Sequence, residues 1–379
     1  MAEVVLRNVK KIYQSRQKKK KEDVLAVKNL NLTIQDGEFL ALLGPSGCGK
    51  TTTLRMIVGL ESITEGEILI DGKVVNSWNP AQRNVAMAFE TYALYTHLTV
   101  RENLGLCLKA KNVQPQEIEK QVNHIAEILK ITDILNVRPS HLSGGQQQRV
   151  SLGRALIRRP SVTMLDEPLS HLDAALRLET RIEIKRIHQR VKGTFIYVTH
   201  DQLEALALAD RVAVMNFAEL QQVGTRKELF EQPANVFVAD FVGEPPINLY
   251  YQSTLEEQDG ELYAVTPQGA YRFQLVPQKR RLLENHQKEK VTLGIRPQHI
   301  GLEQKPGYVP LSGKGALFEF LGEYGYLTVH NQGLDLSLLT PADIESHSEQ
   351  IDIFYDPHKV LLFDSESGEN LALNRTKNI

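Results

Sequence analysis

A glycine-rich segment that ends in lysine and threonine carries the clearest chemistry of this chain. It consists of Gly44, Pro45, Ser46, Gly47, Cys48, Gly49, Lys50 and Thr51. An apolar run over residues 39–43 precedes it and predicts a buried strand, and residues 52–57 predict a helix start. The glycines allow a turn in which successive backbone N–H groups point at one anion, and the helix adds its dipole. Lys50 would then neutralise the β- and γ-phosphates of a nucleotide, and Thr51 would bind Mg²⁺. The complete spacing and both flanks disfavour a chance glycine-rich turn.

Two adjacent carboxylates follow a second apolar run. Residues 162–165 predict a buried strand, which ends on Asp166 and Glu167. Asp166 can hold Mg²⁺, and Glu167 can orient or deprotonate an attacking water molecule. The alternative for Asp-Glu-Pro is a simple loop cap, and the neighbouring phosphate loop weighs against it.

His200 follows a third apolar run, over residues 194–198, and precedes Asp201. A lone histidine is more often structural than catalytic. Here it is predicted at the same sheet edge as the two carboxylates, which favours a functional role. A neutral imidazole there can hydrogen-bond a γ-phosphate and hold the water and Glu167 in place.

A second anion-binding helix start is predicted at Ser143, Gly144 and Gly145. Taken alone, an ordinary N-cap is the better interpretation. One nucleotide needs only one phosphate loop, however, so a second anion site predicts a nucleotide shared between two chains.

These groups require an α/β fold. Strands alternate with helical segments up to about residue 240, which predicts a parallel sheet covered on both faces, with chemistry at the carboxyl ends of its strands. A helical pattern covers residues 99–130. After residues 241–246 short alternating runs dominate, and they predict a mostly β second domain of small barrel type.

Composition limits the remaining possibilities. The 379 residues carry a net charge of -2, so the whole chain is not a polyelectrolyte binder. The two cysteines, Cys48 and Cys107, match no metal spacing and favour a reducing compartment. We expect no signal peptide and no membrane span, since no apolar run approaches the roughly 20 residues that a span needs. Four lysines at residues 18–21 predict a solvated loop, with contact to nucleic acid or anionic lipid as the alternative.

The order of these motifs identifies a family. Phosphate loop, Leu-Ser-Gly-Gly-Gln, Leu-Asp-Glu-Pro, Ser-x-Leu-Asp at residues 170–173 and His200 together resemble the ATPase subunit of an ATP-binding cassette transporter. The resemblance implies a P-loop, RecA-like cassette over residues 1–240 with a helical subdomain at about 91–157. Residues 241–379 resemble the OB/TOBE-like β-barrel regulatory domain of carbohydrate-importer ATPases, most closely the maltose and multiple-sugar group.

The resemblance also implies a role for each matching residue. Tyr13 corresponds to the aromatic residue that stacks on adenine. Glu167 corresponds to the general base and His200 to the switch histidine. The other implied ligands of ATP and Mg²⁺ are the phosphate loop itself, Thr52, Asp166, Ser143, Gly144 and Gly145, the last three reaching the γ-phosphate held by a second subunit. Asp173 corresponds to a contact across that dimer interface.

Partners follow from the same resemblance. It implies a second copy or a close paralogue, and two integral membrane permease subunits whose coupling helices lie in a groove beside residues 92–99. It also implies an indirect link to an extracytoplasmic solute-binding protein, and a peripheral location on the cytoplasmic face of the membrane. The alternatives are an importer ATPase for a polyamine, a glycerol phosphate or an oxyanion, a cassette acting on nucleic acid or the ribosome, and a protein with a dead site. We expect no nucleic-acid partner.

Three positions depart from the family pattern. Glu90 stands where glutamine is usual, at a position that touches Mg²⁺ and the attacking water. A carboxylate is also a hard oxygen ligand, so the residue can still bind the metal. Its charge predicts a working but slower ATPase with altered coupling, which Glu90→Gln would reverse. His171 replaces a common asparagine, and Thr96 stands where proline is frequent in the coupling groove.

Overall fold

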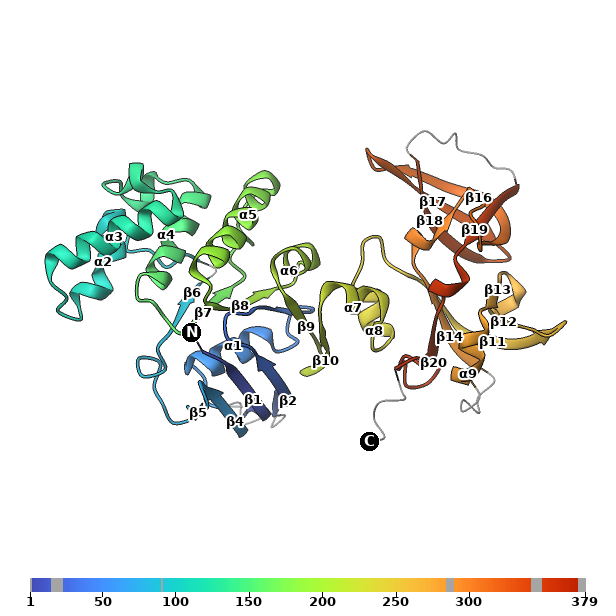
Figure 1. The fold of residues 1–379 in the computed structure, drawn as a ribbon, viewed down its shortest axis with the longest axis horizontal. Coiled ribbons are helices and arrows are strands. Elements are labelled where there is room, and N and C mark those ends of the chain that lie inside the picture. Colours follow the sequence, from blue (N-terminus) through green and yellow to red (C-terminus); the bar gives the residue numbers. More distant parts are fainter. Residues whose placement is uncertain (1, 15–22, 90, 284–289, 342–349, 374–379) are drawn as a thin grey trace, which may run out of the picture. The chain divides into compact units, whose positions relative to one another are not determined.

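The computed structural model describes residues 2–14, 23–89, 91–283, 290–341 and 350–373 (Figure 1). The chain divides into two compact units, Met1–Arg226 and Lys227–Ile379. The sequence predicted functional domains of 1–240 and 241–379, and that division stays a prediction. Within the described residues, no helix is long and apolar enough to cross a membrane.

A six-stranded sheet forms the centre of the first unit. Five of its strands are parallel, and the sixth is an antiparallel edge strand. In spatial order they are β10 (Glu219–Gly224), β9 (Arg211–Asn216), β3 (Phe39–Leu43), β8 (Thr194–Thr199), β7 (Val162–Asp166) and β6 (Val85–Ala88). Every residue of β3, β7 and β8 is buried, as expected for central parallel strands covered on both faces.

Six helices of this unit belong to two groups. Three follow strands of the central sheet: α1 (Lys50–Val58), α5 (Ala174–Val191) and α6 (Gln202–Leu208). The other three pack on one another: α2 (Val100–Lys109), α3 (Pro115–Leu129) and α4 (Gly144–Leu156). Figure 1 shows α2, α3 and α4 grouped together at a distance from α1. α2 and α3 lie within the helical pattern that the sequence predicted over residues 99–130.

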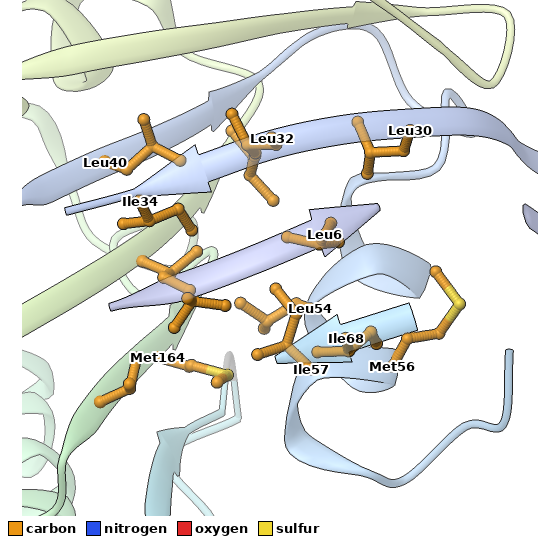
Figure 2. Close-up of a cluster of buried hydrophobic side chains, with 14 of the residues drawn as sticks. Leu6, Leu30, Leu32, Ile34, Leu40, Leu54, Met56, Ile57, Ile68 and Met164 are labelled. Carbon is orange, nitrogen blue, oxygen red and sulfur yellow. The ribbon is translucent and has the colours of Figure 1, made fainter. Parts of the chain in front are cut away.

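A second sheet in this unit was not predicted. Its four strands, all paired antiparallel, are β2 (Val24–Ile34), β1 (Val4–Tyr13), β4 (Glu65–Ile70) and β5 (Lys73–Val74). Apolar side chains of this sheet, of α1 and of the central sheet form one buried cluster. Figure 2 shows Leu54 and Ile57 of α1 beside Leu6 and Ile68, with Met164 of the central sheet to their left. The helix that follows the phosphate loop is therefore fixed from both sides.

The second unit is built mainly from two five-stranded antiparallel sheets. The first contains β13 (Arg272–Leu275), β12 (Glu261–Val265), β11 (Asn248–Gln258), β14 (Lys290–Ile295) and β20 (Leu361–Asp364). The second contains β15 (Ile300–Gly301), β19 (Gln350–Tyr355), β16 (Val309–Phe320), β17 (Tyr324–Asn331) and β18 (Leu334–Pro341). Both sheets contribute to one hydrophobic core, in the manner of a small barrel, as the alternating pattern predicted. The helices are α7 (Arg226–Glu231), α8 (Val236–Phe241) and α9 (Pro277–Leu283).

Candidate functional site

The phosphate loop joins the end of β3 to the start of α1. Gly49 has φ 106°, and a Cβ there would lie 2.4 Å from the carbonyl oxygen of Ala26. A Cβ on Gly44 would lie 2.2 Å from the carbonyl oxygen of Met215. These distances exclude any side chain, so the loop is held tightly between β2 and β9. Its N–H groups stand at a helix N-terminus, where anions bind favourably.

Lys50 places a buried positive charge in this loop. Its side chain is 4% exposed, and its Nζ donates hydrogen bonds to the carbonyl oxygens of Gly44, at 2.7 Å, and Pro45, at 2.9 Å. The Sγ of Cys48 lies 3.9 Å from the same ammonium. Burial raises the pKa of the Cys48 thiol, and the charge of Lys50 opposes that rise. The loop can therefore neutralise an anion that its N–H groups bind.

The oxygen atoms of Thr51 and Asp166 meet beside the loop. The Thr51 hydroxyl donates to Asp166 Oδ1 at 3.3 Å, although the two residues come from α1 and the end of β7. In the described part of the chain, no group of three or more histidine, cysteine or acidic side chains is placed to hold a metal by itself. A hydroxyl and one carboxylate fit Mg²⁺, which takes few protein ligands when phosphate oxygens complete its shell.

Glu167 and His200 lie at the ends of neighbouring strands. Glu167 has φ 43°, a left-handed conformation, and its backbone N–H donates to the carbonyl of Val198 at 3.0 Å. Its Oε2 is 3.1 Å from Nδ1 of His200. The same small cavity is lined by both side chains, with Ser170 nearby. The turn after β7 thus directs Glu167 toward β8, where an imidazole can hold it.

Tyr13 lies at the end of β1, next to the strand β2 that abuts the phosphate loop. As the last residue of β1 it pairs with Val24, two residues before the Ala26 carbonyl that abuts Gly49. Its ring is half-buried, with Lys11 Nζ 4.7 Å from the ring centroid. An adenine bound next to the phosphate loop would therefore lie in the same part of this unit as the ring of Tyr13. Thr52 follows Thr51 in the first turn of α1 and is half-buried.

The predicted second anion site lies at the start of α4. Ser143 caps this helix, and its hydroxyl and amide form a capping box with Gln146. Gly144 and Gly145 begin the helix, and Asp173 caps α5 by accepting from Leu176 N at 3.0 Å. Among the described residues, no hydrogen bond joins these caps to the phosphate loop of the same chain. They are separate from the first anion site.

Two sequence predictions fall outside the described residues. One is Glu90, the predicted ligand that replaces glutamine, and the other is the lysine run at residues 18–21.

Sequence reasoning missed several charged residues that hold the site in place. Arg83 is buried and donates to the carbonyl oxygens of Met56, at 2.7 Å, and Ile57, at 2.9 Å, at the end of α1. Burial lowers its pKa. Arg177 and Glu204 line the cavity of Glu167 and His200. Glu204 follows His200 closely in sequence, but only the fold shows that its side chain turns inward.

A groove of about 570 Å³ lies beside residues 92–99. Tyr92, Tyr95 and Arg154 line it, and the Arg154 guanidinium lies 4.6 Å from the centroid of the Tyr95 ring. Asn103, buried beneath, bonds to the backbone of Tyr95 and Leu98 and fixes this segment. The groove is therefore preformed and partly apolar, as a docking site for a helix requires.

Comparisons with known proteins agree with this geometry. The family model described as ABC transporter matches residues 27–170. The ABC transporter ATP-binding protein YurJ of Bacillus subtilis is 42% identical, over 93% of this chain and 91% of that protein. The trehalose import ATP-binding protein SugC of Mycobacterium tuberculosis is 40% identical, over 98% and 99% of the two chains. The sn-glycerol-3-phosphate import ATP-binding protein UgpC of Bartonella bacilliformis is 48% identical, over 70% and 74%.

Among solved structures, the dimeric post-hydrolysis state of the ATP-binding cassette MJ0796, bound to ADP and Pi, is similar to this chain. The two share 31% sequence identity with a TM-score of 0.52, and the match covers 59% of this chain and 98% of that one.

Proposed function

We propose, from the premise that this chain belongs to the ABC transporter ATP-binding proteins, that it hydrolyses ATP to drive a solute importer. The observation that carries this proposal is that the candidate phosphate-binding, metal-binding and base residues all lie at one edge of the central sheet. Lys50 and the Thr51–Asp166 pair lie at the carboxyl ends of β3 and β7, and the Glu167–His200 pair joins them from β7 and β8. One phosphate site, one metal site and one base thus share a single edge.

Each group has a definite task in hydrolysis. The phosphate-loop N–H groups and Lys50 bind the phosphates of ATP. Thr51 and Asp166 hold Mg²⁺, which when bound offsets the charge that develops on the phosphate oxygens. Glu167 accepts the proton of the attacking water, and His200 orients Glu167 and the γ-phosphate. Glu90 is proposed as a further ligand of the metal.

The active form we propose is a dimer of this chain, or a pair with a close paralogue. Ser143, Gly144 and Gly145 would contact the γ-phosphate of ATP bound to the partner's phosphate loop, with Asp173 across the interface. This proposal is supported by the separation of the α4 cap from the phosphate loop within one chain. The similar cassette MJ0796 is described as dimeric.

The groove beside residues 92–99 is proposed to receive a helix from each of two membrane permeases. The chain would then act on the cytoplasmic face of the membrane, and a solute-binding protein would deliver the cargo from outside. Two of the relatives above are named as import ATP-binding proteins for trehalose and for sn-glycerol-3-phosphate, so the cargo we propose is a carbohydrate, with glycerol phosphate as the second candidate. No nucleic-acid partner is proposed.

Purification of the tagged chain from its own cells in mild detergent tests the whole assignment. We expect two polytopic membrane proteins and a solute-binding protein to accompany it. A matched variant, Arg154→Glu, reverses the charge in the groove. It should be recovered without the permeases, while its Mg²⁺-dependent hydrolysis of ATP continues. Recovery of ribosomal proteins or nucleic acid without membrane subunits would contradict the proposal.

A further inference from the structure

A buried carboxylate lies behind the segment that carries His200. Glu204, in α6, is 3% exposed, and its Oε2 accepts hydrogen bonds from the Tyr197 hydroxyl at 2.8 Å and the Thr199 hydroxyl at 2.9 Å. The Thr199 hydroxyl also accepts from Asp201 N at 3.0 Å. Both neighbours of His200 in the chain are therefore fixed by one hydrogen-bonded cluster. Burial raises the pKa of Glu204, while the two hydroxyl bonds oppose that rise.

Arg177 of α5 connects this cluster to the segment before its own helix. Its Nη2 donates to the carbonyl oxygen of Leu172 at 3.2 Å. Its Nη1 lies 3.6 Å from Asp201 Oδ2, and its Nε lies 3.8 Å from Glu204 Oε1. Leu172 directly precedes Asp173, the residue proposed to contact the second subunit. One guanidinium thus links the interface segment to the segment of His200.

We propose that Arg177 and Glu204 form a positioning bridge that couples closure of the dimer at Asp173 to the placement of His200 beside Glu167. The inference rests on the proposed function, since it assigns a coupling route within that same site. Arg177 and Glu204 do not touch the nucleotide in this scheme. They act through the two strand-end segments that they join.

The distances around Arg177 show how the bridge responds to closure of the dimer. Its Nε is buried and has no hydrogen-bond partner within the described residues, yet the Glu204 carboxylate is only 3.8 Å away. A charge-assisted N–H···O bond is normally about 2.7–2.9 Å long, so a shift of roughly 1 Å completes it. A small movement of the Leu172–Asp173 segment is therefore enough to tighten the bridge and hold His200.

Kinetics of the full chain test the bridge. Arg177→Met keeps most of the side chain's apolar stem and removes its charge. Glu204→Gln keeps an oxygen for Tyr197 and Thr199 and loses only the attraction to Arg177. We expect each variant to lower kcat about tenfold and to leave KM for ATP within about twofold, because an interaction made only in the closed state is lost. Thermal unfolding verifies that each variant is folded.

Lys185→Met is the matched control. Lys185 also projects from α5, and it bonds to the Leu208 carbonyl and lies 3.5 Å from Asp210, beyond the far end of α6. It therefore ties the same two helices together without reaching the His200 segment. We expect kcat of this variant within about twofold of the unsubstituted protein, as for an ordinary exposed ion pair.

Double-mutant cycles separate coupling from general loosening. Arg177→Met is combined with Asp173→Asn, which keeps the helix cap, and separately with His200→Gln. If one route joins these residues, the loss in each double variant equals that of the larger single variant, because a broken route cannot be broken twice. The rates are measured as release of radiolabelled phosphate in a single turnover, because this assay covers both the fast unsubstituted protein and the slow double variants.

The outcomes are distinct. The bridge would be overturned if the losses of kcat multiply in both cycles, or if kcat of Lys185→Met falls as far as that of Arg177→Met. It would also be overturned if the variants change only KM for ATP. Absence of Mg²⁺-dependent hydrolysis by the unsubstituted chain would instead overturn the proposed function. Non-additive cycles with an unimpaired control support the bridge.

Discussion

The two units contain different kinds of buried charge. The first kind is a carboxylate bonded to hydroxyls, as in Asp166 and Glu204 of the first unit. The second kind is a cation whose hydrogen bonds go to backbone carbonyls, as in Arg296, which is buried, and Lys279, which is half-buried, in the second unit. The first unit also contains the second kind, in Lys50 and Arg83. The carboxylates of the first kind lie at or behind the candidate site, and cations of the second kind hold chain segments together.

Arg296 illustrates the second kind. It is 2% exposed, donates to the carbonyl oxygens of Phe230, at 2.9 Å, and Val242, at 2.7 Å, and its guanidinium lies 3.9 Å from the centroid of the Phe230 ring. Burial lowers its pKa to about 10, so it remains charged at neutral pH. Within the second unit it ties α7 and the end of α8 to the end of β14. A buried charge is thus a guide to catalysis only when its partners are considered with it.

The largest effect should follow Glu167→Gln. Removing the base should lower kcat by about 10³-fold, which corresponds to about 4 kcal/mol of barrier, while ATP binding persists. The variant should accumulate as an ATP-bound dimer on size-exclusion chromatography. Glu65→Gln, which alters an exposed ion pair with Lys10 in the same unit, should hydrolyse ATP normally. A Glu167→Gln protein with the normal rate would refute the assignment of the base.

Alkylation of Cys48 should act nearly as strongly. An adduct inside the tight loop would block the phosphates, so we expect at least about a 100-fold loss of hydrolysis and protection by Mg-ATP. Because burial raises the pKa of the thiol, labelling should quicken as pH rises through the range where thiolate forms. In the Cys107→Ala variant only Cys48 can be labelled, and mass spectrometry measures the extent of its modification. Full activity after complete modification would contradict the placement of this loop around the phosphates.

Arg296→Met should affect stability and spare catalysis. Two buried carbonyls would lose their donor, so we expect about 2–3 kcal/mol of destabilisation in urea unfolding of the second unit. Phosphate release per folded molecule should stay within about twofold. If hydrolysis falls without any loss of stability, Arg296 has a functional role and the contrast between the units fails.

A pH-dependent effect on stability concerns Lys279. Burial is the main cause that lowers its pKa from 10.5 to about 7, while Asp356 partly opposes the shift. Between these two pH values the unfolded chain binds more protons than the folded chain, so this residue makes stability rise with pH. The stability of the unsubstituted protein relative to Lys279→Met should therefore increase from pH 7 to pH 10 in urea unfolding.

Lys314→Met, at an exposed lysine of β16, is the control for that experiment. It should keep the pH slope of the unsubstituted protein. An identical slope in Lys279→Met would show that the pKa of this lysine is not lowered in the folded protein.

Local pattern predicted most elements but not all of their pairings. The strands predicted over residues 39–43, 162–165 and 194–198 appear as β3, β7 and β8, and the helical pattern over residues 99–130 appears as α2 and α3. Periodicity did not show that β1, β2 and β4 form a separate antiparallel sheet. Pairing depends on which apolar faces meet in the core, and this information is not local. The short helix α9 within the β unit was also missed.

Residue types and their spacing along the chain predicted the phosphate loop, the carboxylate pair and the histidine, because glycine, lysine and acidic residues at strand ends have few other uses in that order. The side chains that support them became visible in the folded structure alone. Glu204 of α6 bonds to Tyr197 of β8, Arg177 of α5 approaches Asp201 and Glu204, and Arg83 donates to the end of α1, so each of these contacts joins two different elements. No spacing along one element encodes those contacts, because packing of several elements sets the distance and direction of each.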